Sequence, residues 1–315
     1  MEYSVVIPVY NEEANIGILY NRMTGVMAGL SPDFELLFIN DGSRDNTLML
    51  VRELAASDSR VHFIDLSRNF GHQIAVCAGL DACRGKRVVI IDADLQDPPE
   101  LIPEMAARMD DGFQVVYARR KKRKGESVAK LWTARIFYRL LANIASIDIP
   151  LDTGDFRIMD KKVVEVLRSM PEQNKFLRGQ ISWIGFRQTF VEYDRAERQG
   201  GKTGYTYAKM FRFALDGITS FSDAPLRMAS WMGFVVSGFA FIALLYALYG
   251  KFISHDSEPG WASLIVSVLF LGGIQLISLG FIGEYLSRIS SNVKQRPLYV
   301  VADSNLKEKK DKPQD

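Results

Sequence analysis

Two long uncharged stretches near the end of the chain constrain its fold more than any other feature. No residue is charged from Met228 to Tyr249, or from Trp261 to Gly283. Each stretch exceeds the roughly 20 residues that a helix needs to cross a hydrocarbon core about 30 Å thick. Buried helices of a soluble protein are the alternative, but they rarely stay uncharged over this length. We therefore expect two membrane-spanning helices, at 228–250 and 261–284.

The short link between these stretches predicts a transmembrane hairpin. Only Gly250 to Gly260 lies between them, and basic residues flank the outer ends of the pair at Arg227, Arg288, Lys294 and Arg296. The positive-inside rule then places both chain termini in the cytoplasm. We expect a cytoplasmic domain at 1–227, the hairpin at 228–284 and a cytoplasmic tail at 285–315.

Short apolar segments and helical segments alternate in the first hundred residues. Strands are expected at 4–9, 35–39, 61–66 and 87–91, with helices between them. This alternation predicts an α/β domain whose parallel sheet is covered by helices on both faces. Ligands of such sheets bind beyond the carboxyl ends of the strands.

Polar clusters follow all four expected strands. They are Tyr10-Asn11-Glu12, Asp41-Gly42-Ser43, Arg68-Asn69-Phe70-Gly71-His72 and Asp92-Ala93-Asp94-Leu95-Gln96-Asp97. One acidic residue at a strand end is usually a helix cap. Four clusters at four successive strand ends indicate a single ligand site instead.

Asp92 and Asp94 form the most acidic part of this expected site. Two carboxylates this close repel each other unless a positive group lies between or beside them. A hard divalent cation removes the repulsion, and a substrate diphosphate can complete its oxygen shell. Mg²⁺ or Mn²⁺ fits, because the sequence has no Cys/His set that favours zinc. The sequence also lacks a glycine-rich phosphate loop, so metal and basic side chains must neutralise the diphosphate.

Three motifs in this region resemble family 2 glycosyltransferases of the GT-A fold. They are Val6-Ile7-Pro8-Val9-Tyr10-Asn11-Glu12-Glu13, Asn40-Asp41-Gly42-Ser43-Arg44-Asp45-Asn46-Thr47 and Asp92-Ala93-Asp94-Leu95-Gln96-Asp97-Pro98-Pro99-Glu100. Later motifs are similar to those of the polyprenyl-phosphate glycosyltransferases, which include dolichyl-phosphate mannose synthase and the bactoprenol glucosyltransferases. These motifs are Thr153-Gly154-Asp155-Phe156-Arg157, Gly201-Lys202-Thr203-Gly204-Tyr205 and 216–222.

The resemblance implies a fold for nearly the whole chain. It implies a GT-A, Rossmann-like, mostly parallel sheet with helices on both faces, juxtamembrane amphipathic helices and the two-helix transmembrane hairpin. The expected amphipathic segments are 128–147 and 207–221, where apolar stripes such as Leu131, Trp132 and Tyr138 lie beside basic residues. Such helices suit the headgroup region of a membrane, and packing in a protein core is the alternative.

The resemblance also implies roles for individual residues. It places Pro8, Tyr10, Glu12, Asp41 and Asp92 around the donor nucleotide, and it makes Asp94, Asp92 and Gln96 the metal ligands. Asp155 is the implied general base. A phosphate monoester with a pKa near 6 is already largely deprotonated at neutral pH, however. We therefore expect Asp155 either to position the acceptor or to take a residual proton.

Six consecutive basic residues, Arg119 to Lys124, contrast with a net charge of only +2 for the whole chain. A solvated loop is the ordinary interpretation of such a run. We favour phosphate binding beside an anionic membrane, where each basic residue adds about 1 kcal/mol. Many relatives carry Ser-Lys-Tyr at 203–205, where this chain has Thr-Gly-Tyr. Candidates for the acceptor phosphate or the diphosphate are Arg119, Arg120, Ser127, Arg135, Arg198 and Lys202. His72 is a candidate donor contact or a helix cap.

The implied activity is that of an inverting, metal-dependent glycosyltransferase at the cytoplasmic face of the bacterial inner membrane. A phosphate oxygen of undecaprenyl phosphate, or another polyprenyl phosphate, would displace UDP from a UDP-sugar. Glucose is the first expectation, and UDP-N-acetylglucosamine, GDP-mannose and a modified UDP-pentose are alternatives. A processive polysaccharide synthase or a nonenzymatic membrane scaffold is a more distant alternative. The low net charge predicts no nucleic-acid partner, and the sequence leaves a homo-oligomer open.

Overall fold

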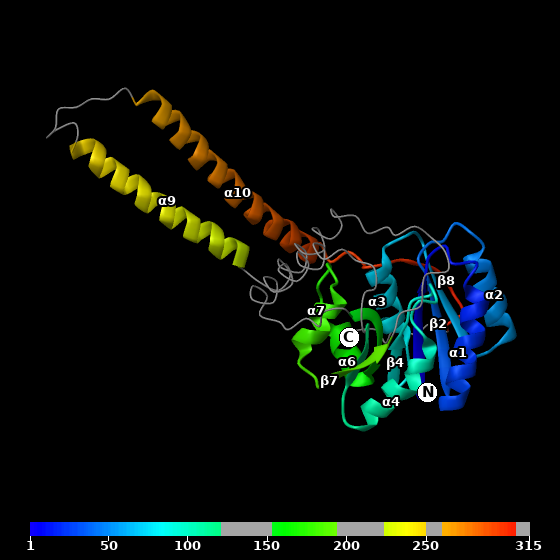
Figure 1. Cartoon of the computed structure of the whole chain (residues 1–315). Helices are drawn as coiled ribbons and strands as arrows, with labels where there is room; N and C mark the ends of the chain where they lie inside the picture. Colours follow the sequence, from blue (N-terminus) through cyan, green and yellow to red (C-terminus); the bar gives the residue numbers. More distant parts are fainter. Residues whose placement is uncertain (121–152, 194–223, 250–259, 307–315) are drawn as a thin grey trace, which may run out of the picture. The chain divides into compact units, whose positions relative to one another are not determined.

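The computed structural model describes residues 1–120, 153–193, 224–249 and 260–306. The chain divides into two compact units (Figure 1). The first unit contains the described residues before 194 together with those from Arg296 onward. The second contains helices α9 (Ala224–Tyr249) and α10 (Trp261–Lys294). The expected amphipathic helices at 128–147 and 207–221 lie outside the described residues.

In the first unit the described residues form a mixed eight-stranded sheet, in the order β7-β5-β6-β4-β1-β2-β3-β8. Strands β6 and β8 run antiparallel to their neighbours, and the other pairs are parallel. The strands are β1 (Tyr3–Val9), β2 (Phe34–Asn40), β3 (Val61–Leu66), β4 (Arg87–Ile90), β5 (Val115–Arg120), β6 (Thr153–Asp160), β7 (Gln188–Tyr193) and β8 (Val301–Ser304).

Helices cover both faces of this sheet. Alternate residues of β1 enter different buried clusters, since Val5 and Ile7 belong to one and Val6 to the other. The first cluster includes α1 (Ile16–Leu30) and α4 (Ile102–Asp110). The second includes α3 (His72–Ala82), α6 (Lys161–Ser169) and α7 (Leu177–Ile184). The unit is completed by α2 (Thr47–Ser57) and the short 3-10 helix η1 (Pro99–Leu101). The expected α/β architecture is confirmed.

The two helices of the second unit expose many apolar side chains, among them Trp231, Phe234 and Leu276. Within the part of the chain that the structure describes, one helical stretch, Phe270–Lys294, is long and apolar enough to cross a membrane. The region Ala229–Ile242 of α9 forms a shorter apolar helix. Large exposed apolar surfaces mark contact with lipid or with protein. These features establish one candidate span, and the second span stays a prediction.

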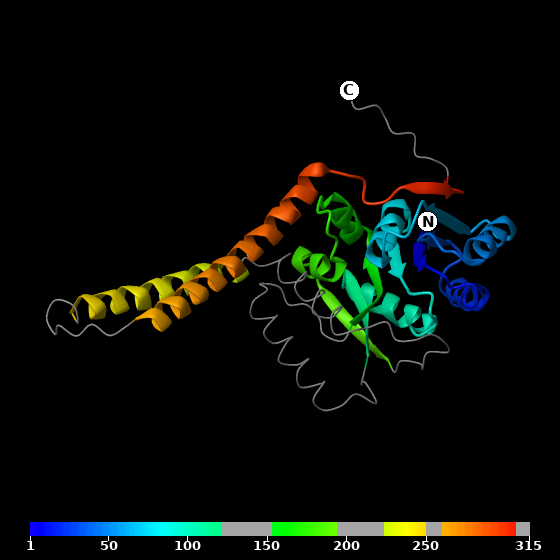
Figure 2. The same cartoon turned by 90° about the horizontal axis from the view of Figure 1, so that it is seen from above.

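After α10 the chain returns to the first unit as β8, which pairs antiparallel with the edge of β3 (Figure 2). The sequence predicted only a tail at 285–315 and gave no sign of this strand. The residues Val-Ala-Asp-Ser of β8 are mostly exposed and lack the apolar alternation by which strands are recognised. Pairing with β3, far away in the sequence, defines this strand.

Candidate active site

The parallel strands β1 to β4 bring all four polar clusters to one edge of the sheet. Val9 at the end of β1 pairs with Asn40 at the end of β2, and the Asp41 backbone N–H donates to the Val9 carbonyl oxygen. β4 lies on the other side of β1, and β3 on the other side of β2. The carboxyl ends of these strands therefore face the same side, as the sequence predicted.

Asp41 fixes the loop that follows β3. Its side chain is buried, and its two oxygens accept hydrogen bonds from the backbone N–H groups of Phe70 (2.7 Å) and Gly71 (3.0 Å). Burial raises the pKa of this carboxyl, and these two bonds oppose the rise. At Gly42, where φ is +68°, a Cβ would lie 2.6 Å from the backbone carbon of Arg68. The two loops therefore approach too closely for any residue with a side chain at position 42.

The other residues expected around the nucleotide lie at the end of β1. Pro8 is within the strand, and Tyr10, just beyond it, is exposed. Glu12 accepts a hydrogen bond from the Asn15 side chain (2.6 Å), while its backbone N–H donates to Thr47 Oγ1 (2.8 Å). The loops after β1 and β2 are thus joined before any ligand binds.

The acidic segment after β4 contains two buried carboxylate oxygens with no hydrogen-bond partner among the described residues, Asp92 Oδ1 and Asp97 Oδ2. Asp92 Oδ1 lies 3.5 Å from His72 Nε2. Burial raises the pKa of Asp92 to about 6. The negative charge of Asp155 adds to this rise, and the positive charge of His72 opposes it. Asp94 Oδ1 accepts a hydrogen bond from the backbone N–H of buried Gln96 (3.1 Å).

Asp155 on β6 lies at the centre of a cationic cluster. Its Oδ2 is 3.0 Å from His72 Nε2, and its Oδ1 accepts a hydrogen bond from Arg178 Nε (2.9 Å). Arg157 Nη2 lies 3.6 Å from Oδ1, and Gln73 Nε2 donates to Oδ2 (3.3 Å). Asp155 is therefore contacted from β6, from α7 and from the beginning of α3.

This cluster strongly shifts the protonation of its members. Burial disfavours the Asp155 carboxylate, but the His72 hydrogen bond and the charges of Arg178 and Arg157 lower its pKa far below the usual range. Burial likewise disfavours the His72 imidazolium, yet Asp155 and Asp92 raise the pKa of His72 to about 9. Asp155 is consequently a stable anion and a weak base at neutral pH.

A second hydrogen-bonded chain joins the acidic segment to the basic run. The Tyr193 hydroxyl donates to Asp97 Oδ1, and Arg120 Nε donates to the Tyr193 oxygen (3.3 Å). Arg119, the preceding residue, pairs with Glu192 and lies over the Phe190 ring, 3.6 Å from its centroid. The structure thus connects Arg120, and not Arg119, to the acidic segment.

Comparison with known proteins decides the family. The family model described as Glycosyl transferase family 2 matches residues 4–168, more than half of the chain. The chain belongs to glycosyltransferase family 2. The resemblance seen in its motifs is confirmed, and the protein is an enzyme.

Relatives of this glycosyltransferase align along almost its entire length. It is 51% identical over 304 residues to "Uncharacterized glycosyltransferase YkcC" of Bacillus subtilis (strain 168), covering 96% of this chain and 94% of that protein. It is 42% identical over 301 residues to "Prophage bactoprenol glucosyl transferase homolog" of Escherichia coli (strain K12), covering 96% and 98%. A crystal structure of S. aureus TarS 1-349 in complex with UDP-GlcNAc aligns with a TM-score of 0.48 at 19% identity, covering 70% of this chain and 66% of that one. The structural similarity is too distant to support an argument about ligands.

The glycosyltransferase site brings together only some of the residues that its sequence suggested. His72 lies between Asp92 and Asp155, with its Nε2 3.5 Å from Asp92 Oδ1 and 3.0 Å from Asp155 Oδ2. Ser127, Arg135, Arg198 and Lys202 lie outside the described residues. Sequence reasoning gave no role to Gln73, Arg178 or Tyr193. Arg157 belongs to the family motif at 153–157, which could have pointed to a role for it. Arg178 and Tyr193 lie in ordinary amphipathic segments and carry no such motif.

The acidic segment fits a divalent cation that shares its shell with a substrate. Among the described residues, no group of three or more His, Cys, Asp or Glu side chains could hold a metal ion by itself. Asp92 nevertheless has a buried oxygen without a hydrogen-bond partner in the described chain, and Asp94 follows two residues later. Mg²⁺ and Mn²⁺ prefer such oxygen ligands and readily accept phosphate oxygens to complete their coordination.

Proposed function

We propose that this glycosyltransferase moves glucose from UDP-glucose to a polyprenyl phosphate, with inversion at the anomeric carbon. The observation that carries the proposal is the cluster around Asp155, where His72, Arg157 and Arg178 gather beside the acidic segment. An active centre that joins two phosphate-bearing substrates needs such cations to offset their negative charge. The relative named as a bactoprenol glucosyl transferase homolog, aligned over 96% of this chain, supports glucose and a polyprenyl acceptor.

In the proposed reaction, an oxygen of the acceptor phosphate bonds to the anomeric carbon while the bond to the UDP diphosphate breaks. UDP leaves with the electron pair. The acceptor needs no strong base, because its phosphate is largely ionised at neutral pH. Asp155 therefore holds and orients His72 and Arg178, and these two groups bind the phosphates. Buried Arg157 donates to the Gly154 and Asp155 carbonyls and adds positive charge. Asp92 and Asp94 would hold Mg²⁺ or Mn²⁺, which supplies Lewis-acid stabilisation of the leaving diphosphate.

Purified full-length protein should form glucosyl-phosphoryl-undecaprenol from UDP-glucose, undecaprenyl phosphate and Mg²⁺ or Mn²⁺. Parallel reactions with UDP-N-acetylglucosamine, GDP-mannose and a modified UDP-pentose identify the sugar, and mass spectrometry of the lipid fraction identifies the product. A single added sugar is expected. A ladder of added sugars would indicate a processive synthase, and failure with every donor would refute a transferase acting on this lipid.

We also propose that the chain crosses the bacterial inner membrane twice, at 228–250 and 261–284, with both termini in the cytoplasm. The candidate span Phe270–Lys294 and the apolar helix Ala229–Ile242 support this arrangement. It would keep the catalytic unit at the membrane face where an acceptor lipid phosphate lies.

Cysteine labelling tests this topology. Ser254→Cys, in the link between the spans, should react with a membrane-impermeant maleimide in intact cells from which any outer membrane has been removed. Ser57→Cys, on an exposed face of α2, should react only after the cells are made permeable. The native Cys77 and Cys83 are buried and give little background. Labelling of Ser254→Cys only after permeabilisation would exclude the two-span arrangement.

A further inference from the structure

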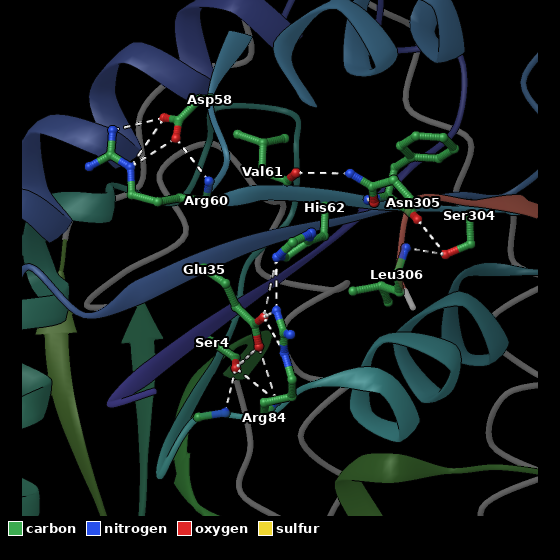
Figure 3. Close-up of polar contacts among 12 residues, drawn as sticks. Ser4, Glu35, Asp58, Arg60, Val61, His62, Arg84, Ser304, Asn305 and Leu306 are labelled. Carbon is green, nitrogen blue, oxygen red and sulfur yellow. Dashed lines mark hydrogen bonds and ion pairs between the residues drawn. The ribbon is translucent and has the colours of Figure 1, made fainter. Parts of the chain in front are cut away.

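The segment from Arg296 to Leu306, which we call the C-terminal strap, is held along β3 by side chains as well as by strand pairing (Figure 3). The Asn305 side chain accepts a hydrogen bond from the Phe63 N–H (2.8 Å) and donates to the Val61 carbonyl (3.2 Å). The Ser304 hydroxyl donates to the Phe63 carbonyl (3.0 Å). This end of the strap is therefore fixed to the middle and the beginning of β3.

The other end of the strap reaches the segment that leads into the active site. The Val300 carbonyl accepts a hydrogen bond from the N–H of Ser67, the first residue after β3 (2.9 Å). The Tyr299 hydroxyl donates to Asp81 Oδ2 on α3 (3.0 Å). The Tyr299 ring packs against the same buried cluster as the ring of Phe70. The strap thus contacts both elements between which residues 67–71 form a loop.

That loop carries the contacts on which the candidate site depends. Asp41 binds its Phe70 and Gly71 N–H groups, and the next residues, His72 and Gln73, bind Asp155. The loop is consequently held by Asp41 on the side of the site and by the strap beyond the end of β3. The strap follows α10 after a single residue, Gln295, and is hydrogen-bonded to the loop at Ser67.

We propose that Tyr299 is a positioning residue of the transferase, which acts by holding the 67–71 loop in the conformation that presents His72 to Asp155. The Tyr299 hydroxyl restrains α3 at Asp81, near the C-terminal end of the helix, and its ring packs against the buried cluster that Phe70 also contacts. The adjacent Val300 carbonyl restrains Ser67. Asp41 is then already placed to bind the donor nucleotide, and His72 is already placed to contact Asp155. Neither side chain has to rearrange when substrate binds. The kinetic part of this inference rests on the proposed function, and the structural part does not.

Hydrogen exchange of the full-length protein in lipid nanodiscs tests the structural part without any substrate. Tyr299→Ala removes the ring and the hydroxyl, and we expect exchange at the Phe70 and Gly71 amides to become about tenfold faster, as loss of a partly buried aromatic contact implies. Tyr299→Phe keeps the ring and should restore most of the protection. Amides in the middle of β1, such as that of Ile7, should exchange as in the wild type.

The kinetic part is tested with the same variants. Tyr299→Ala should raise the KM for the nucleotide-sugar about tenfold with a smaller change in kcat, and Tyr299→Phe should lie close to the wild type. Asp303→Asn is the matched control on the strap, because it breaks the half-exposed pair with Arg52, which contributes little, while the amide oxygen can still accept the Ser304 N–H. Asp303→Asn should change neither the exchange of the Phe70 and Gly71 amides nor the KM for the nucleotide-sugar.

Three results would overturn the proposal. They are unchanged exchange at Phe70 and Gly71, equally faster exchange throughout the sheet, or an unchanged KM in Tyr299→Ala despite a loosened loop. A wild-type protein that turns over no donor would instead count against the proposed function, while the exchange data would still decide whether Tyr299 holds the loop. The two failures are therefore distinguishable.

Discussion

Asp155→Asn should reduce kcat by at least about 100-fold and should also destabilise the folded catalytic unit. The neutral amide cannot balance His72, Arg157 and Arg178, which all lie within 4 Å of the carboxylate. Removing one partner from a buried ionic cluster costs roughly 3–5 kcal/mol. Displacement of catalytic groups by about 1 Å can by itself lower the rate about 100-fold. Initial rates at saturating donor and thermal unfolding measure the two effects.

Asp160→Asn is the matched control, because Asp160 ends the same strand as Asp155 but caps α6. Its side chain accepts a hydrogen bond from the Lys162 N–H (2.8 Å). Asparagine caps helices about as well as aspartate, so activity and unfolding temperature should stay near the wild-type values. If kcat and the unfolding temperature fell equally in both variants, the effect of Asp155→Asn would be general destabilisation. An Asp155→Asn enzyme with a normal rate at pH 7.5 would remove Asp155 from the mechanism.

The pH dependence of the rate separates two roles for Asp155, general base and positioning residue. A general base needs a pKa near the working pH, whereas the surrounding cations hold the pKa of Asp155 far below its usual range. We therefore expect the wild-type rate to show no ionisation of Asp155 between pH 6.5 and pH 8.5, whereas the pKa of His72 should fall in Asp155→Asn, because Asp155 raises it in the wild type. The family resemblance suggested a base, and the physical argument from acceptor ionisation suggested positioning. The observed contacts favour positioning.

The strands and helices that the sequence predicted well are those in which local pattern and burial agree. Strand β3 begins and ends at the predicted residues, because its apolar run is bounded there by polar residues. The convergence of Asp41, His72 and Asp92 was also predictable, since parallel strands place their carboxyl ends on one edge. These inferences need only the order of the strands along the chain.

The remaining features depend on contacts between distant parts of the chain. His72 and Arg178 stand 83 and 23 residues from Asp155, and only the packing of α3 and α7 in the same buried cluster on one face of the sheet brings them to it. Strand β8 exists because the edge of β3 accepts it. Arg119 and Arg120 are adjacent in the basic run, yet alternation along β5 directs them to different partners. No local pattern distinguishes the arginine that reaches the acidic segment.

Asp94→Asn should lower kcat/KM by about 100- to 1000-fold at physiological Mg²⁺, and excess Mn²⁺ should recover part of the loss. Replacing a carboxylate by an amide removes a charged oxygen from the proposed cation site, and stabilisation of the leaving diphosphate is worth several kcal/mol. Initial rates over a range of Mn²⁺ concentrations, at fixed UDP-glucose and undecaprenyl phosphate, measure the apparent metal affinity. Removal of divalent cations with a chelator should abolish wild-type turnover.

The control for this substitution is Asp111→Asn, an equal change of charge on the exposed C-cap residue that follows α4. Its metal dependence should match that of the wild type, because an exposed carboxylate outside the site neither binds the cation nor touches the donor. The decisive comparison is the midpoint of the Mn²⁺ curve, which should move to higher concentration in Asp94→Asn alone. Superimposable curves for Asp94→Asn and the wild type would show that Asp94 is not a metal ligand. The buried Asp92 oxygen would then be the stronger candidate, since it has no hydrogen-bond partner in the described chain.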